Sequence, residues 1–257
     1  WALILEKNSQ MLELDLWLKI AKSAALEGGN YLLQNQGKEP KVLMDSGRDI
    51  KLQLDTDTEK LIKESLSLQS SFSILGEETG LSDNLGEFYW VVDPLDGTSN
   101  FLRDIPISCV SIALMQDVTP ILGVIYDFNH DDLYFGHQNS KAFLNQNEIT
   151  VSDYSKKNQS TLVTGIPAKT HYSDEEFKNM INDFQDWKKV RMIGSAAMAA
   201  IYVAAGKAET YKENGIFLWD IAAGAAIVEA AGGVASIKNI QADYRVDAIF
   251  TNQHLAN

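Results

Sequence analysis

Two aspartates lie three positions apart in residues 90–101, which read W-V-V-D-P-L-D-G-T-S-N-F. The apolar, β-branched residues before Asp93 predict a buried strand. Pro94 and the pair Asp96-Gly97 predict that the chain turns directly after that strand. Two carboxylates on one tight turn repel each other, and a hard divalent cation such as Mg²⁺ would remove the repulsion.

The backbone amides that follow these carboxylates are placed to bind an anion. Gly97 and Thr98 come where a helix can start, and amides at a helix start bind phosphate. Carboxylates for a metal beside amides for an anion predict metal-assisted phosphate chemistry. One alternative is a plain Asp-rich loop, because Asp, Gly and Pro are common in turns. Another is the haloacid dehalogenase signature D-x-D-G-T, but its aspartates are two positions apart, whereas Asp93 and Asp96 are three apart.

Other acidic residues lie at the ends of predicted elements. Glu77 follows a predicted strand at residues 71–75, so Glu77 and Asp93 are expected at one edge of a sheet. Asp220 begins a predicted helix of small residues, and Asp55 precedes another predicted helix. Taken alone, neighbouring glutamates are usually surface charge, and an aspartate at a helix start is usually a cap.

The composition restricts the class of protein. A chain of 257 residues that is 45% hydrophobic can form one large domain or two closely joined halves. A net charge of −13 argues against nucleic-acid binding, and no apolar run approaches the ~20 residues of a membrane span. The single cysteine, Cys109, allows no intrachain disulfide, and no signal-peptide pattern is recognised, so we expect a cytoplasmic protein.

Hydrophobic periodicity predicts mixed α and β structure in two halves. Residues 1–10 are set apart as an extension before a predicted helix at residues 13–36. Residues 11–150 are expected to form an N-terminal α+β half that carries most of the acidic candidates. Residues 151–257 are expected to form a C-terminal α/β half that carries Asp220. The polar residues 38–49 predict a loop.

The segment 90–101 resembles the signature of the inositol monophosphatase family, W-[IV]-[IV]-D-P-[IL]-D-G-T-x-N-F. The sequence G-E-E at residues 76–78 and the stretch W-D-I-A-A-G-A-A-I-V-E-A-A-G-G at residues 219–233 are similar to two further family motifs. Residues 49–59 are similar, more loosely, to a family segment whose last aspartate matches Asp55. The resemblance implies the sugar-phosphatase fold, a layered α-β-α-β-α arrangement of the α+β or α/β class, and a homodimer.

The resemblance also implies roles for individual residues, with two or three Mg²⁺ ions per subunit. Glu77, Asp93 and the Leu95 carbonyl would hold one ion, and Asp93, Asp96 and Asp220 a second. Asp55 would take part in catalysis near a third ion. The remaining implied roles are water orientation by Glu77 and Thr98, phosphate binding by the Gly97 and Thr98 amides, and substrate contacts from Ser195, Ala196 and Glu213.

The implied reaction is Mg²⁺-dependent, lithium-sensitive hydrolysis of a small phosphorylated polyol or sugar by a metal-activated water. The sequence D-G-T-S-N-F at residues 96–101 favours inositol monophosphate, because the nucleotide-phosphatase branch usually carries D-G-T-K-E-F. A fructose-1,6-bisphosphatase or a 3'(2'),5'-bisphosphate nucleotidase is the alternative. A non-enzymatic regulatory protein that retains the fold is a third hypothesis. No nucleic-acid or membrane partner is expected.

Overall fold

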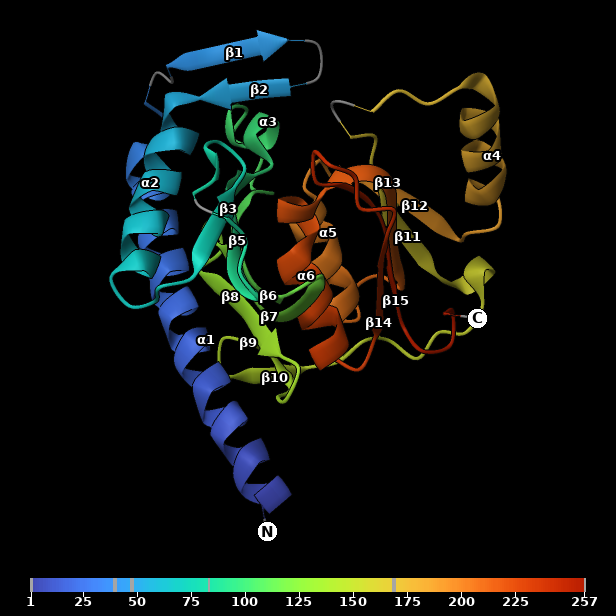
Figure 1. Cartoon of the computed structure of the whole chain (residues 1–257). Helices are drawn as coiled ribbons and strands as arrows, with labels where there is room; N and C mark the ends of the chain where they lie inside the picture. Colours follow the sequence, from blue (N-terminus) through green and yellow to red (C-terminus); the bar gives the residue numbers. More distant parts are fainter. Residues whose placement is uncertain (1, 39–40, 47–48, 83, 168–169, 257) are drawn as a thin grey trace.

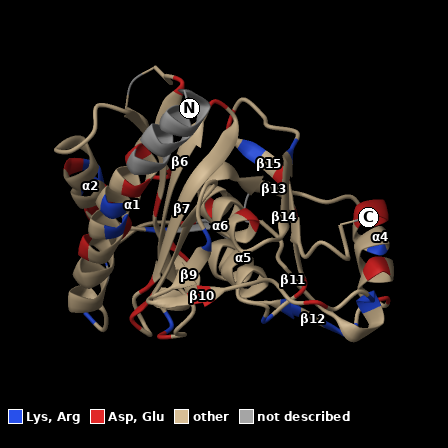
Figure 2. Ribbon diagram, turned by 90° about the horizontal axis from the view of Figure 1, so that it is seen from below, with Lys and Arg blue, Asp and Glu red and all other residues tan. Residues whose placement is uncertain are grey.

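The structure is a computed structural model that describes residues 2–38, 41–46, 49–82, 84–167 and 170–256, without the side chains of residues 2–12, 46, 49 and 50. Five layers follow one another across the molecule (Figure 2). They are a pair of helices, an eight-stranded sheet, a second pair of helices, a five-stranded sheet and one outer helix. This confirms the layered α-β-α-β-α arrangement expected from the sequence.

The eight-stranded sheet has the order β10-β9-β8-β7-β6-β5-β3-β4. Its strands are β3 (Ser73–Gly76), β4 (Gly80–Leu81), β5 (Phe88–Asp96), β6 (Cys109–Gln116), β7 (Thr119–Asp127), β8 (Asp132–His137), β9 (Ala142–Leu144) and β10 (Asn147–Ile149). Along β5, Trp90 and Val92 pack toward α1 (Ala2–Asn35) and α2 (Gln53–Ser67), whereas Tyr89 and Val91 pack on the opposite face. Because both faces are covered, the strand is continuously apolar.

The five-stranded sheet has the order β12-β11-β13-β15-β14. Its strands are β11 (Thr161–Thr164), β12 (Lys189–Met192), β13 (Thr210–Phe217), β14 (Val234–Lys238) and β15 (Arg245–Thr251). The helices α5 (Ala196–Ala204) and α6 (Leu218–Ala230) lie between the two sheets, and α4 (Asp174–Phe184) lies outside the smaller one (Figure 1). Short helices are α3 (Thr98–Phe101) and the 3₁₀ turn η1 (Lys157–Gln159).

Small residues let the central helix α6 approach its neighbours closely. A Cβ atom placed on Gly224 of α6 would lie 2.3 Å from the Ala200 Cβ of α5. A Cβ atom on Gly123 of β7 would lie 2.1 Å from the carbonyl oxygen of Ala223 in α6. The Ala- and Gly-rich sequence of α6 therefore sets how near this helix, which carries Asp220, lies to the larger sheet.

Gly123→Ala should lower the free energy of unfolding by about 3 kcal/mol or more, the upper end of overpacking costs, because the clash is with backbone that cannot rotate away. Urea unfolding measures the change. Gly86→Ala is the control, because its Cβ atom would meet only the Phe88 carbonyl oxygen at 3.6 Å. Equal stability of the two variants would contradict the close α6–β7 contact.

The structure differs from the sequence-based expectations at the N-terminal side. The prediction of a loop at residues 38–49 is wrong in part, because β1 (Val42–Ser46) and β2 (Asp49–Leu52) pair as an antiparallel hairpin. A short exposed hairpin is held together by backbone hydrogen bonds, so its sequence needs no alternation of apolar and polar residues from which a strand could be predicted. Residues 39–40 and 47–48 of that loop lie outside the described residues. Helix α1 begins at Ala2, so the stretch set apart as an extension continues the same helix.

The proposed division into halves near residue 151 stays a prediction. Strand β10 ends at Ile149 and β11 begins at Thr161, and the larger sheet precedes this connection while the smaller follows it.

None of the helices in the described residues has the length and apolar character needed to cross a bilayer.

Candidate active site

The two aspartates of the 90–101 segment face the same side of β5 because the strand is irregular between them. Asp93 pairs with Ser111 of β6 and Asp96 pairs with Cys109, so three steps on β5 match two steps on β6. In a regular strand, residues three positions apart point to opposite faces, and the extra residue removes that difference. The Leu95 amide donates to Asp93 Oδ1 at 3.0 Å, which closes the turn.

Glu77 reaches the same edge through parallel strand pairing. Strand β3 runs parallel to β5 with Gly76 opposite Val92. The residues that follow this pair in the sequence, Glu77 and Asp93, are therefore neighbours. The Glu77 amide also donates to the Val92 carbonyl oxygen at 3.1 Å. This placement confirms that the two strand ends lie at one edge of one sheet.

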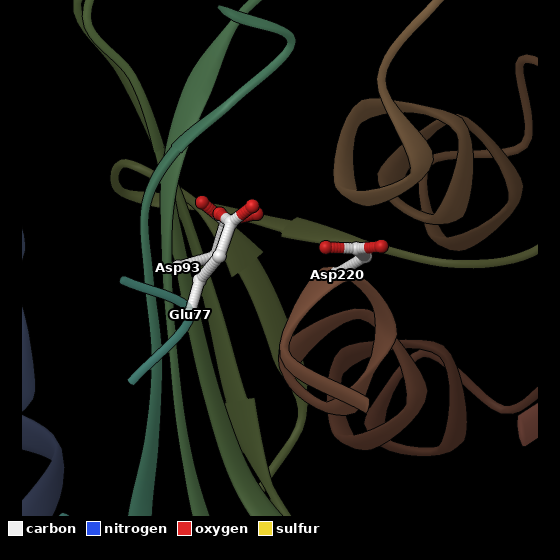
Figure 3. A group of neighbouring side chains, drawn as sticks. All are labelled: Glu77, Asp93 and Asp220. Atoms are coloured by element: carbon white, nitrogen blue, oxygen red, sulfur yellow. The ribbon is translucent and has the colours of Figure 1, made fainter. Parts of the chain in front are cut away.

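Asp220 approaches this edge from the opposite layer, on the first turn of α6. Carboxylate oxygens of Glu77, Asp93 and Asp220 lie within 4.8 Å of one another. Figure 3 shows the carboxylates of Glu77 and Asp93 together at the strand ends and Asp220 facing them from its helix. Among the described residues this is the one group of three or more potential metal-ligand side chains.

A cavity of about 290 Å³ opens at this cluster between the two sheets. Its lining includes every site residue predicted from the sequence except Asp55: Glu77, Asp93, Leu95, Asp96, Gly97, Thr98, Ser195, Ala196, Glu213 and Asp220. It also includes residues that the sequence analysis did not single out: Ser99, Thr164, Gly165, Ile166, Pro167, Gly194, Ile216 and Phe217. Four of these, residues 164–167, lie at or directly after the end of β11, and their place at a strand end was the available signal.

Asp55 lies apart from this lining, buried in the first turn of α2. Its Oδ2 accepts a hydrogen bond from the Leu52 amide at 2.8 Å, which is the helix-capping role weighed as an alternative in the sequence. Its charge nevertheless acts on Glu77, whose pKa it helps to raise. A role for Asp55 near a third ion stays a prediction.

Asp96 is held from the second half of the chain. Its Oδ2 accepts hydrogen bonds from the Ser195 hydroxyl at 2.5 Å and from the Ala197 amide at 2.7 Å. The Ser195 hydroxyl oxygen also accepts from the Met198 amide at 3.1 Å, so the same side chain caps α5. The N-terminus of α5 is thereby tied to the β5 turn.

Ser195→Ala should lower the free energy of unfolding by about 1–2 kcal/mol, because the helix loses its cap and Asp96 loses a donor. If Asp96 binds a metal, affinity for Mg²⁺ should also fall, by about 10-fold. Urea unfolding and calorimetric titration measure the two effects. Ser160→Ala is the control, because Ser160 is also buried and donates to the Lys156 carbonyl, outside the site. Unchanged Mg²⁺ affinity in Ser195→Ala would argue against Asp96 as a ligand.

The site concentrates negative charge that burial makes costly. Burial raises the pKa of Glu77 to about 8, with the neighbouring Glu78 as the next cause. Burial, followed by the charge of Glu77, raises the pKa values of Asp93 and Asp220 well above their ordinary range. Burial raises the pKa of Asp96 to about 6 although its hydrogen bonds oppose the rise.

The donor set fits a hard divalent cation. All candidate side-chain ligands are carboxylates, and oxygen ligands of this kind suit Mg²⁺. None of the lining residues that the structure describes is a Lys or an Arg. A cation bound among these residues would therefore supply positive charge that the described lining lacks, both for the carboxylates and for an anionic ligand.

The model of the inositol monophosphatase family matches residues 13–248. The chain belongs to the inositol monophosphatase family. The match covers the β3 and β5 strand ends and the start of α6, so the clustered carboxylates lie within the matched residues.

Curated relatives of this family span most of the chain. Nus factor SuhB of Xylella fastidiosa is 38% identical over 220 residues, 84% of this chain and 80% of its own length. Inositol-1-monophosphatase of Synechocystis is 35% identical over 235 residues, which are 87% of this chain and 79% of its own length. Fructose-1,6-bisphosphatase/inositol-1-monophosphatase of Aquifex aeolicus is 33% identical over 231 residues, 88% of each. The solved inositol monophosphatase of Anabaena superimposes with a TM-score of 0.82 at 32% identity, covering 94% of this chain and 92% of its own. The family identifies this protein as a phosphoric monoester hydrolase.

Proposed function

We propose that this protein hydrolyses inositol monophosphate, with myo-inositol 1-phosphate as substrate, in a reaction that requires Mg²⁺. The observation that carries the proposal is the cavity in which three carboxylates from three elements converge and the described lining has no basic side chain. A phosphate ester cannot enter such a site without added cations, because like charges at this separation repel strongly in a buried environment.

Two ion positions would account for four of the five carboxylates that line the cavity, all except Glu213. Glu77, Asp93 and the Leu95 carbonyl would form one, and Asp93, Asp96 and Asp220 the other, with Asp93 common to both. When bound, Mg²⁺ ions would lower the pKa of an attacking water and neutralise charge on the leaving oxygen. The hydrogen bond from Thr98 Oγ1 to the Leu95 carbonyl oxygen, at 3.0 Å, would place the hydroxyl next to the first position.

The protein groups would orient water and substrate. Glu77 and the Thr98 hydroxyl would align the water, and the amides of Gly97, the N-cap of α3, and of Thr98, its first residue, would hold phosphate oxygens. Ser195, Ala196 and Glu213 lie across the same cavity and would contact the polyol ring. Burial, followed by the charge of Asp96, raises the pKa of Glu213 to about 8, so its protonated form can donate to a substrate hydroxyl at neutral pH.

The described lining favours one phosphate over two. A second phosphate, as in fructose 1,6-bisphosphate or 3'-phosphoadenosine 5'-phosphate, would add two negative charges with no Lys or Arg among the lining residues described. The hydroxyls of a polyol, in contrast, can pair with Ser195 and Glu213. This supports a monophosphate of a neutral polyol.

Phosphate release from inositol 1-phosphate, fructose 1,6-bisphosphate and 3'-phosphoadenosine 5'-phosphate tests the proposal. We expect kcat/KM to be highest for inositol 1-phosphate, activity to vanish with EDTA, and Li⁺ to inhibit. A preference for a bisphosphate would favour the fructose-bisphosphatase or nucleotidase alternative. Metal binding without turnover of any of the three esters would favour a regulatory protein that retains the fold.

A further inference from the structure

A buried glutamate of α2 holds the turn that carries Glu77. Glu59 is 0% exposed, and its carboxylate lies beneath residues 77–79. Its Oε2 accepts from the Glu78 amide at 2.8 Å, and its Oε1 accepts from the Thr79 amide at 3.0 Å and from the Thr79 hydroxyl at 2.5 Å. Lys63, one helical turn further along α2, lies 3.4 Å from Oε1 and supplies the opposite charge.

The end of β3 is shaped to admit this carboxylate. A Cβ atom on Gly76 would lie 2.4 Å from Glu59 Cδ and Oε1, so a larger residue at this position would displace the carboxylate. The side chain of Glu78 turns away from it and pairs with Lys51 of β2 at 3.0 Å. The turn is thus held by a buried carboxylate on one side and an ion pair on the other.

Glu77 lies between two fixed pieces of backbone. Its own amide donates to the Val92 carbonyl oxygen at 3.1 Å, which sets it beside Asp93. The next two amides, of Glu78 and Thr79, both donate to Glu59. These bonds fix the peptide planes after Glu77 and so restrict where its side chain can point.

We propose that Glu59 is a positioning residue for the metal site: its carboxylate fixes the 77–79 turn so that Glu77 meets Asp93 at the first of the two proposed ion positions. The inference rests on the proposed Mg²⁺ dependence. Groups that orient a metal ligand commonly matter almost as much as the ligand, because the ligand otherwise spends binding energy on becoming ordered. Glu59 is placed for that task through the backbone on either side of the metal-facing residue.

Glu59→Gln is the main test, because it keeps the side-chain length but replaces one acceptor oxygen with an NH₂ group. An NH₂ group cannot accept, so either the Glu78 amide or the two Thr79 donors would face another donor. We expect the Kd for Mg²⁺, measured by calorimetric titration without substrate, to rise about 10- to 100-fold. We expect kcat at saturating Mg²⁺ to recover toward the wild-type value, since no group that contacts substrate is altered.

Two further variants separate positioning from general stabilisation. Glu209→Gln is the matched control, because Glu209 is also buried and accepts from a backbone amide, that of Thr161 at 2.5 Å, at the start of β13 and outside the cavity lining. It should lose stability and keep the wild-type Kd for Mg²⁺. Thr79→Val removes one of the bonds to Glu59 without altering its charge, and it should raise the Kd by a smaller factor than Glu59→Gln.

The outcomes are distinguishable from failure of the proposed function. A wild-type protein that binds no Mg²⁺ would overturn the metal dependence itself. A wild-type protein that binds Mg²⁺, with an unchanged Kd in Glu59→Gln, would overturn only the role of Glu59. An equal rise of Kd in Glu209→Gln would do the same, because it would show that lost stability alone weakens the site. If Glu59→Gln does not fold, Thr79→Val decides by the same criterion.

Discussion

Asp93→Asn should lower kcat by more than about 100-fold, since changing residues that merely support metal ligands already costs about 10- to 100-fold in activity or affinity. Asp93 is the carboxylate assigned to both proposed ion positions, and asparagine offers one neutral oxygen in its place. The fold should persist, because an asparagine Oδ1 can still accept from the Leu95 amide, as Asp93 does at 3.0 Å. Steady-state phosphate release at saturating Mg²⁺ measures the effect.

Asp117→Asn is the control for the loss of one negative charge from the same sheet. Asp117 lies at the opposite end of β5 and β6, in the turn before β7, with a positive φ of 52° that asparagine also adopts. This variant should keep wild-type kcat. If Asp93→Asn also kept it, while remaining folded, the assignment of Asp93 as the shared ligand would be wrong.

The metal-free protein should lose stability as the pH rises, and Mg²⁺ should restore it. Folding raises the pKa of Glu77 from 4.5 to about 8 and that of Asp96 from 3.8 to about 6. Between the unfolded and the folded pKa of each carboxyl group, the folded protein binds more protons than the unfolded chain. The free energy of unfolding therefore falls with increasing pH in this range. Each pKa unit of difference corresponds to about 1.4 kcal/mol. The stability of the protonated cluster is thus fully present below about pH 4 and lost as the pH passes 8.

Urea unfolding at pH 5, 7 and 9, with EDTA or with Mg²⁺, measures this dependence. At a fixed concentration equal to 100 times its Kd at pH 7, Mg²⁺ should add about 2.7 kcal/mol at that pH. The gain at the same concentration should be larger at pH 9, where the carboxylates are charged. Surface carboxylates contribute equally to the wild type and to Asp93→Asn, so the difference between the two proteins reports on the buried cluster. The free energy of unfolding should fall less steeply with pH in that variant. A metal-free stability that rises from pH 6 to 8 more steeply in wild type than in Asp93→Asn would contradict the electrostatic account.

The residue types of the site could be predicted from the sequence because they lie in local patterns. The apolar run before Asp93 predicts a strand, the Asp-Gly pair predicts a turn, and the small residues after Asp220 predict a closely packed helix. Each of these depends on neighbours within a few positions, where backbone preference and periodicity act directly. The structure shows the strand as β5, although it continues through Asp96 instead of ending before Asp93, and it shows the turn at Gly97 and the helix as α6.

The contacts that support the site were beyond sequence patterns because they join distant segments. Nothing near Glu59 indicates that its carboxylate binds amides 19 and 20 residues away. The bond from Ser195 to Asp96 spans 99 residues, and Ser195 by itself predicts only a helix cap. The β1–β2 hairpin was missed for a related reason: its pairing is between backbone groups, which any sequence can supply.

The sequence by itself determined which carboxylates the chain has, which strand or helix end carries each, and the family to which it belongs. Tertiary structure alone decided that three of those carboxylates meet within 4.8 Å. Their meeting depends on the parallel register of β3 on β5 and on the seating of α6 against Gly123. Side-chain spacing along one element is set by the backbone repeat, whereas the distance between elements is set by packing, and the packing includes residues from the whole chain.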